Sequence, residues 1–141
     1  MSTGPALASA LTFVWLGMVL AISFLEAPLK FRAPGVTLQI GLGIGRLVFR
    51  ALNTAEVVMA VGIAVALGLS NPRISVVVPV AVATGTLIVQ LIGVRPRLTR
   101  RSDAVLAGEN TPRSHAHYVY VGLEVVKIVA LILGGILLLS S

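Results

Sequence analysis

The chain contains no cysteine and few charged residues. The absence of cysteine excludes disulfide bonds, thiolate catalysis and cysteine-ligated metal sites. Charged residues make up 11% of the 141 residues, whereas soluble domains carry about a quarter. A chain with so little polar surface cannot cover itself in water, so a soluble globular protein is excluded as well.

The chain has long apolar runs instead. Hydrophobic residues make up 57% of it, and its mean hydropathy is +1.00. Four runs approach the ~20 residues that a helix needs to cross a bilayer, and none alternates as a membrane strand does. The length fits one domain. The sequence therefore predicts an all-α integral membrane four-helix bundle, a single transmembrane domain over 1–141, with helices at about 6–26, 46–69, 74–94 and 117–139.

Prolines mark three of the predicted helix ends. Pro28 follows the first run, Pro72 the second and Pro96 the third. The first run has no Lys or Arg before it and exceeds a signal-peptide core in length, so we interpret it as an uncleaved helix. Residues 99–114 are expected to form a polar loop. Segment 29–50 is either an early extension of the second helix, which we favour, or an amphipathic piece on the membrane surface.

The basic residues predict the orientation in the membrane. The formal net charge is +6, and nine of the lysines and arginines lie in segments 27–50 and 95–116, against one in the loop between the second and third helices. Positive charge gathers in cytoplasmic loops. We therefore expect a multi-pass cell-membrane protein with these two segments cytoplasmic and both termini non-cytoplasmic. Because the charges flank apolar runs, contact with anionic lipid explains them better than nucleic acid does.

Ionisable groups inside the hydrocarbon are costly and therefore informative. The chain has only five acidic residues, and three of them lie within or at the edge of predicted helices. A rise of about 1.5 Å per residue places one polar residue of each helix at a similar level, about 6–10 Å from a basic or histidine residue at the predicted surface. These residues are Glu26, Glu56, Gln90 and Glu124.

The polar residues also share helix faces. Asn53 and Glu56 are three residues apart, and Tyr120, Glu124 and Lys127 continue a stripe along the fourth helix. A buried glutamate that holds a proton near neutral pH can act as a general acid or base or as a proton carrier. The candidate site has Glu56, Glu124 and Glu26 as acid/base groups, and Lys127, Arg46, Asn53, Gln90, Tyr120 and His117 as binding groups.

Other interpretations of these residues stay open. The charged residues can form an ion-pair network that only holds the bundle together. His115 and His117 suggest a metal, but the Glu-x-x-His spacing of helical di-metal sites is absent, and two histidines at one helix start do not suit haem. We expect neither a metal nor a cofactor. Small residues four apart, as at Gly17 and Ala21 or Ala60 and Ala64, favour packing within the chain over self-association.

Three short motifs resemble the four-helix membrane family of the DUF4149/TMEM205 type. They are Glu26-Ala27-Pro28-Leu29-Lys30-Phe31, Val94-Arg95-Pro96-Arg97-Leu98 and the His117 that opens the fourth helix. Helix count and loop lengths are similar over most of the chain. The resemblance implies the same four-helix membrane architecture. Glu56, Glu124 and Lys127 match no feature of that family, so no site residue is taken from it.

Three functions fit the sequence. The first is binding of an amphipathic, lipid-like molecule, of isoprenoid or polyketide type, at the cytoplasmic side, with glutamate acid/base chemistry such as isomerisation, cyclisation or hydration. A carrier usually holds its substrate near the midplane, and the polar level lies nearer one surface. The second is a proton-coupled transporter or channel acting as a homo-oligomer. The third is a non-catalytic subunit beside a larger membrane partner.

Overall fold

The computed structural model describes residues 2–109 and 115–140, and in these ranges regular structure is entirely helical. The segments join end to end into four long helices, Thr3–Arg32, Leu38–Gly68, Ile74–Leu106 and His115–Leu139, each long and apolar enough to cross a membrane. The predicted all-α class is confirmed. The segments are α1 (Thr3–Val19), η1 (Leu20–Glu26), α2 (Ala27–Leu29), η2 (Lys30–Arg32), α3 (Leu38–Gly68), α4 (Ile74–Val89), η3 (Gln90–Val94), α5 (Arg95–Leu106) and α6 (His115–Leu139).

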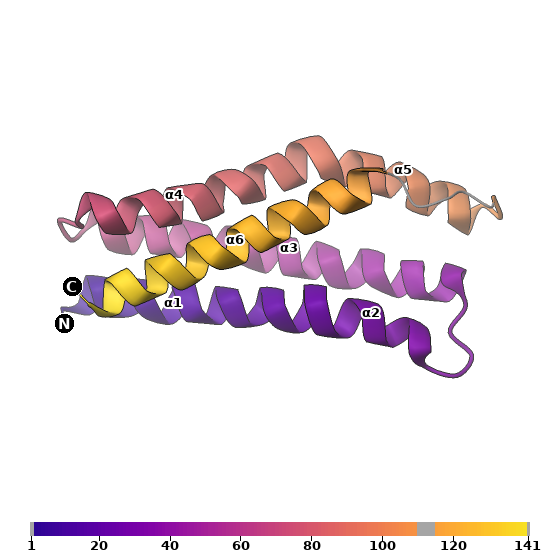
Figure 1. Ribbon diagram of the computed structural model, residues 1–141, viewed down its shortest axis with the longest axis horizontal. Helices are drawn as coiled ribbons and strands as arrows, with labels where there is room; N and C mark the ends of the chain where they lie inside the picture. The colour runs from indigo at the N-terminus through magenta and orange to yellow at the C-terminus, as the bar shows by residue number, and fades with distance from the viewer. Residues whose placement is uncertain (1, 110–114, 141) are drawn as a thin grey trace.

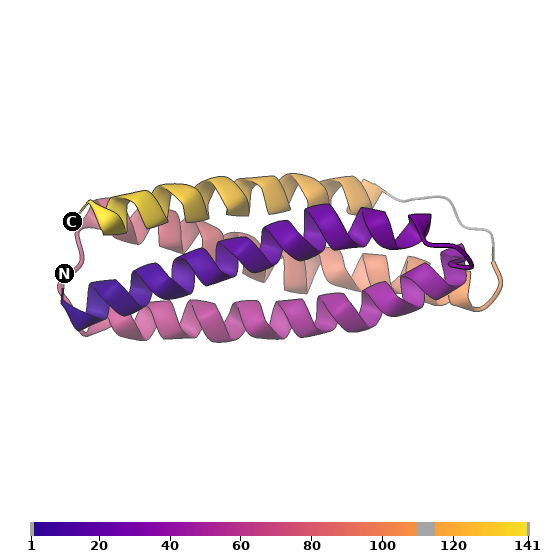
Figure 2. The same cartoon turned by 90° about the horizontal axis from the view of Figure 1, so that it is seen from below.

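The four long helices run alternately up and down (Figures 1 and 2). Helix α1 packs against α3 and α6, and α6 packs against α4. The start of α1 and the end of α6 lie together at one end, which we call the terminal end. The opposite end carries most of the basic side chains and is called the basic end. The segments that lie toward this end, η2, the first half of α3 and α5, hold the basic residues Lys30, Arg32, Arg46, Arg50, Arg95, Arg97, Arg100 and Arg101.

Two predicted helix ends are wrong. The first helix continues through Pro28 to Arg32, and the third continues through Pro96 to Leu106, so residues 99–106 of the predicted polar loop 99–114 are helical. Each proline lies two residues beyond a π-helical segment, η1 or η3. A proline has no N–H to donate and its ring crowds the carbonyl four residues back. The wider π turn before each proline relieves that crowding and lets the helix continue. Residues 110–114 lie outside the described ranges.

The segment before the second long helix extends that helix, as we favoured. Helix α3 begins at Leu38, well before the predicted start. The Thr37 hydroxyl caps it by accepting the Ile40 N–H at 3.2 Å, and Gly35 turns the chain with a φ of +82°. Three polar residues of this extension, Gln39, Arg46 and Arg50, therefore lie on a helix.

The outer faces of the bundle carry apolar side chains, whereas Lys127, Glu56 and Glu124 are buried inside it. Large hydrophobic residues such as Leu47 and Ile92 are exposed, whereas Lys127 and Glu56 are 0% exposed. That inversion suits lipid surroundings, where an outward charge is costly and an outward leucine is not.

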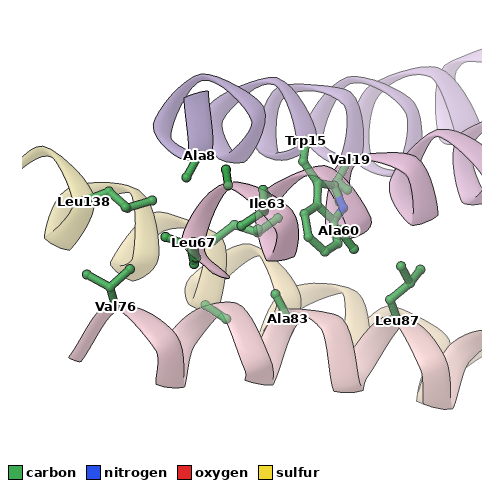
Figure 3. Packing of buried hydrophobic residues seen from close by; sticks show 13 residues of the cluster. Ala8, Trp15, Val19, Ala60, Ile63, Leu67, Val76, Ala83, Leu87 and Leu138 are labelled. Atoms are coloured by element: carbon green, nitrogen blue, oxygen red, sulfur yellow. The ribbon is translucent and has the colours of Figure 1, made fainter. Parts of the chain in front are cut away.

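The terminal half is a close-packed apolar core. Figure 3 shows Trp15 and Val19 of α1 directed at Ala60 and Ile63 of α3, with the α4 residues beneath them. A Cβ on Gly135 would lie 2.7 Å from the Phe13 ring, so the helices approach closely there. Ala60 is buried in this core, as the packing interpretation expects, whereas Gly17 is exposed on the outer face. The other buried members are Ala8, Ala66, Leu67, Val76, Ala83, Leu87, Ala130, Leu131 and Leu138.

Candidate functional site

Lys127 lies at the centre of a buried polar network. Its Nζ forms ion pairs with Glu56 and, at 2.5 Å, with Glu124 Oε1, and it donates a hydrogen bond to Gln90 Oε1 at 2.9 Å. These partners come from three different long helices. Lys127 and Glu56 are 0% exposed and Glu124 and Gln90 1%. The network therefore joins α3, η3 and α6 through charges that water does not reach.

Glu124 uses both carboxylate oxygens. Its Oε1 accepts the Gln90 Nε2–H at 3.2 Å as well as the lysine, and its Oε2 accepts the Ser23 hydroxyl at 2.6 Å. Gln90 also donates to the Tyr120 backbone oxygen at 3.3 Å. With donors on both oxygens, the Glu124 carboxylate is held in a fixed orientation.

Glu56 uses only one carboxylate oxygen. Its Oε2 takes Lys127 and the Trp15 Nε1–H, the latter at 2.8 Å. Its Oε1 is buried and has no hydrogen-bond partner among the described residues. An unpaired buried oxygen is costly, because it lacks the hydrogen bonds that water would give it. We refer to Trp15, Ser23, Glu56, Gln90, Glu124 and Lys127 as the buried network.

The two π-helical segments lie at the level of the buried network. Ser23 belongs to η1, and Gln90 is the first residue of η3. A π turn rotates the side chains that follow it relative to an α-helix, and such turns occur often at functional sites. Ser23 and Gln90 donate hydrogen bonds to the same carboxylate, that of Glu124.

The charges of the buried network do not balance. Two carboxylates face one ammonium, and the network contains no second cation. With every group ionised it would carry one excess negative charge in a medium where unpaired charge is very unfavourable. One proton on a carboxylate removes that excess, and Glu56 Oε1 is the carboxylate oxygen of the network that is open to take it.

A second group of polar and aromatic side chains lies toward the basic end. The Phe49 ring is 5.7 Å from Lys30 Nζ and 5.3 Å from the Arg95 guanidinium carbon, measured to its centroid. The same guanidinium lies 4.7 Å from the Tyr120 ring centroid, and the two rings meet edge to face. We refer to Lys30, Phe49, Arg95 and Tyr120 as the basic-end cluster.

Among the described residues, the buried polar side chains beyond the network that do not bond to their own helix lie toward the basic end. Toward the basic end lie the basic-end cluster and Asn53, which is 8% exposed and whose Oδ1 has no partner among the described residues. Toward the terminal end, buried side chains are apolar, apart from hydroxyls such as those of Thr12 and Thr86 that bond to their own helix carbonyls. Polar side chains therefore lie beside the network on the side of the basic end.

The structure brings four predicted site residues together, namely Glu56, Gln90, Glu124 and Lys127. Tyr120 and Asn53 lie next to these four residues, toward the basic end. Three others lie elsewhere. The Glu26 side chain is 35% exposed and faces Lys30 at 3.6 Å, Arg46 pairs with Asp103 at 2.8 Å near the end of the bundle, and the His117 ring packs against Tyr118.

Sequence reasoning missed Trp15, Ser23 and Arg95. Trp15 is the single tryptophan, and a mid-span tryptophan needs a partner for its indole N–H. That requirement was a usable signal. Ser23 and Arg95 had none, because their directions depend on the π turns.

Neither histidine forms part of a metal cluster. In the part of the chain that the structure describes, no three His, Asp or Glu side chains lie close enough to hold an ion. His115 is exposed at the first turn of α6, and His117 is half-buried beside Tyr118.

Comparison with known proteins found no matching family model, no matching curated protein and no matching solved structure. The resemblance to the DUF4149/TMEM205 type therefore stays a prediction, and the function is argued from the geometry of the site alone.

Proposed function

We propose that the bundle binds an amphipathic, lipid-like molecule from its basic end and that Glu56 exchanges a proton with it. The observation that carries this proposal is the asymmetry of the two glutamates. Glu124 has donors on both oxygens, whereas Glu56 keeps one buried oxygen without a partner. A group that only stabilised the bundle would gain from saturating both oxygens.

The direction of polarity supports a ligand with two unlike ends. Its polar end would meet the basic-end cluster and Asn53, and its apolar tail would lie among the apolar helix faces. An isoprenoid or a polyketide-like chain has this character. The distribution of lysine and arginine favours the basic end as the cytoplasmic side, so the ligand would enter from the cytoplasmic leaflet.

Acid/base chemistry at Glu56 would need no cofactor. In an isomerisation or a ring closure, a protonated Glu56 gives its proton to one atom of the ligand, and a carboxylate takes a proton back from another. Lys127 and the Trp15 N–H stabilise the Glu56 anion between the two transfers. The proton count of the ligand is unchanged, so no oxidant or reductant is required.

The test is native mass spectrometry of the protein purified from membranes. We expect a hydrophobic molecule of defined mass to remain bound to the wild-type chain and to be reduced in Glu56→Gln. Glu26→Gln is the matched control, because it makes the same chemical change at a carboxylate outside the buried network. Equal amounts in wild type and Glu56→Gln, or no bound molecule in any variant, would contradict the proposal.

A proton-coupled transporter is the second candidate, and the charge imbalance of the buried network favours it. A site that holds one exchangeable proton suits a relay. Transport also requires access from the terminal end, where the buried side chains form an apolar core. Proton flux into liposomes that Glu56→Gln abolishes and Glu26→Gln preserves would favour this candidate over the first.

A further inference from the structure

Arg95, in the basic-end cluster, has hydrogen-bonding groups that are buried and unused. Its Nε and Nη2 atoms are enclosed and have no hydrogen-bond partner among the described residues. Its contacts are instead with ring faces, at 4.7 Å to the Tyr120 centroid and 5.3 Å to the Phe49 centroid. The rings hold the guanidinium in position and leave its donors free.

The two unused atoms lie on the same edge of the guanidinium. The N–H groups of Nε and Nη2 point in parallel, at the spacing of the two oxygens of a carboxylate or phosphate. An arginine whose ring-facing sides are occupied, and whose Nε and Nη2 atoms are enclosed and unpaired, presents a bidentate donor edge to an anion. The ring contacts do not satisfy those donors, because a cation–π contact supplies no acceptor atom for the guanidinium N–H groups.

The surroundings add further recognition groups. Tyr120 is 7% exposed, and its hydroxyl likewise has no hydrogen-bond partner among the described residues. Lys30 lies on the same Phe49 ring as Arg95, with its side chain 10% exposed. Glu26 pairs with Lys30 at 3.6 Å, and among the described residues the Arg95 guanidinium forms no ion pair with a carboxylate.

We propose that the free edge of Arg95, with the Tyr120 hydroxyl, binds one phosphate or carboxylate group, the anionic head of a lipid whose chains lie along the helices. This inference rests on the proposed function for the idea of an amphipathic ligand, and it names the chemistry of that ligand's polar end. The position suits a lipid head, because Arg95 starts the helix that continues the third span beyond its π segment toward the basic end.

The experiment titrates the full-length protein in detergent with dioleoyl phosphatidylglycerol and, separately, with dioleoylglycerol, which has the same chains and no phosphate. Native mass spectrometry measures the bound fraction. We expect phosphatidylglycerol to bind at least about tenfold more tightly than dioleoylglycerol, as charge-assisted hydrogen bonds imply. Equal binding of the two lipids would overturn the proposal.

Variants separate the donor edge from general positive charge. Arg95→Gln should weaken phosphatidylglycerol binding roughly tenfold, whereas the exposed neighbour Arg97→Gln should change it by less than about twofold. Arg95→Lys keeps the charge without the fork and should lose most of the affinity. If Arg95→Gln fails to fold, Arg95→Lys and Tyr120→Phe give the answer, since both preserve volume. Equal losses in the Arg95 and Arg97 variants would overturn the proposal.

Inorganic phosphate distinguishes the two sources of the anion. Displacement of the lipid by phosphate, at constant ionic strength, would assign the site to a free phosphate, and resistance to displacement would assign it to a lipid head; both support anion recognition by Arg95. The titration uses added lipid and varies Arg95, Arg97 and Tyr120, whereas the test of the proposed function varies Glu56 and follows the molecule that co-purifies with the protein. Failure of the Glu56 experiment and failure of this one are therefore distinguishable.

Discussion

The two halves of the bundle use opposite means to bring helices together. In the terminal half, α1, α3, α4 and α6 meet through alanine, glycine and apolar side chains, with Gly135 against Phe13 and Gly62 against Leu11. In the half nearer the basic end, the contacts between helices are charges, amides and ring faces. Close packing needs no specific chemistry, whereas each buried polar contact must be satisfied or is costly.

The same division separates regular from irregular helix. The terminal half is α-helical, and both π segments lie at the level of the buried network or just beyond it. Irregular backbone beside a partly unsatisfied polar cluster is what function adds to a fold, since neither feature improves packing. Substitutions confined to one half measure separately how much each kind of contact contributes to stability.

The largest effect is expected from Lys127→Met. It leaves two facing carboxylates without their cation, and breaking a buried ion pair from one side costs about 3–5 kcal/mol. Thermal unfolding in detergent measures the loss. Lys30→Met is the control, because its pair with Glu26 is partly exposed and should be worth less than about 1 kcal/mol. A Lys127→Met protein as stable as the wild type would show that the buried network does not hold the helices of the bundle together.

An intermediate effect is expected from Gly135→Val in the terminal half. The added side chain would meet the Phe13 ring, and overpacking of this kind costs about 1–3 kcal/mol. Gly122→Val on the same helix is the control, because nothing lies within 4 Å of a Cβ there. The difference between the two melting temperatures reports the packing alone. No difference would mean that the helices do not approach closely at this level.

The smallest effect is expected from Arg46→Gln. Its pair with Asp103 joins side chains that are 36% and 58% exposed, and exposed pairs contribute about 0–1 kcal/mol. We expect unchanged lipid binding as well, since Arg46 lies outside the basic-end cluster. A loss of binding as large as that of Arg95→Gln would return Arg46 to the site and weaken the distinction between the buried groups and the surface charges.

The sequence predicts the fold better than the site. Apolar runs of membrane-spanning length define the four helices, and polar spacing on α3 and α6 brings Glu56, Glu124 and Lys127 together. The ends of the first and third helices could not be predicted, because a proline normally ends a helix and here a π turn accommodates it.

The side chains that the first and third spans contribute to the site were also hard to predict, because both spans contain a π-helical segment. Depth alone selected Glu26, yet the first span reaches the network through Trp15 and Ser23. Arg95 was counted as a topology signal, whereas its side chain turns onto Tyr120. Residue spacing gives the level of a group along a helix, but the direction of a side chain after a π segment depends on tertiary structure.

The proposed function requires one exchangeable proton at Glu56, and infrared spectroscopy of the protein in lipid detects that proton. The carbonyl stretch of a protonated carboxyl group should be present at neutral pH, shift on exchange into D₂O, and disappear in Glu56→Gln while persisting in Glu26→Gln. Absence of that band from the wild type, or its persistence in Glu56→Gln, would contradict the central claim.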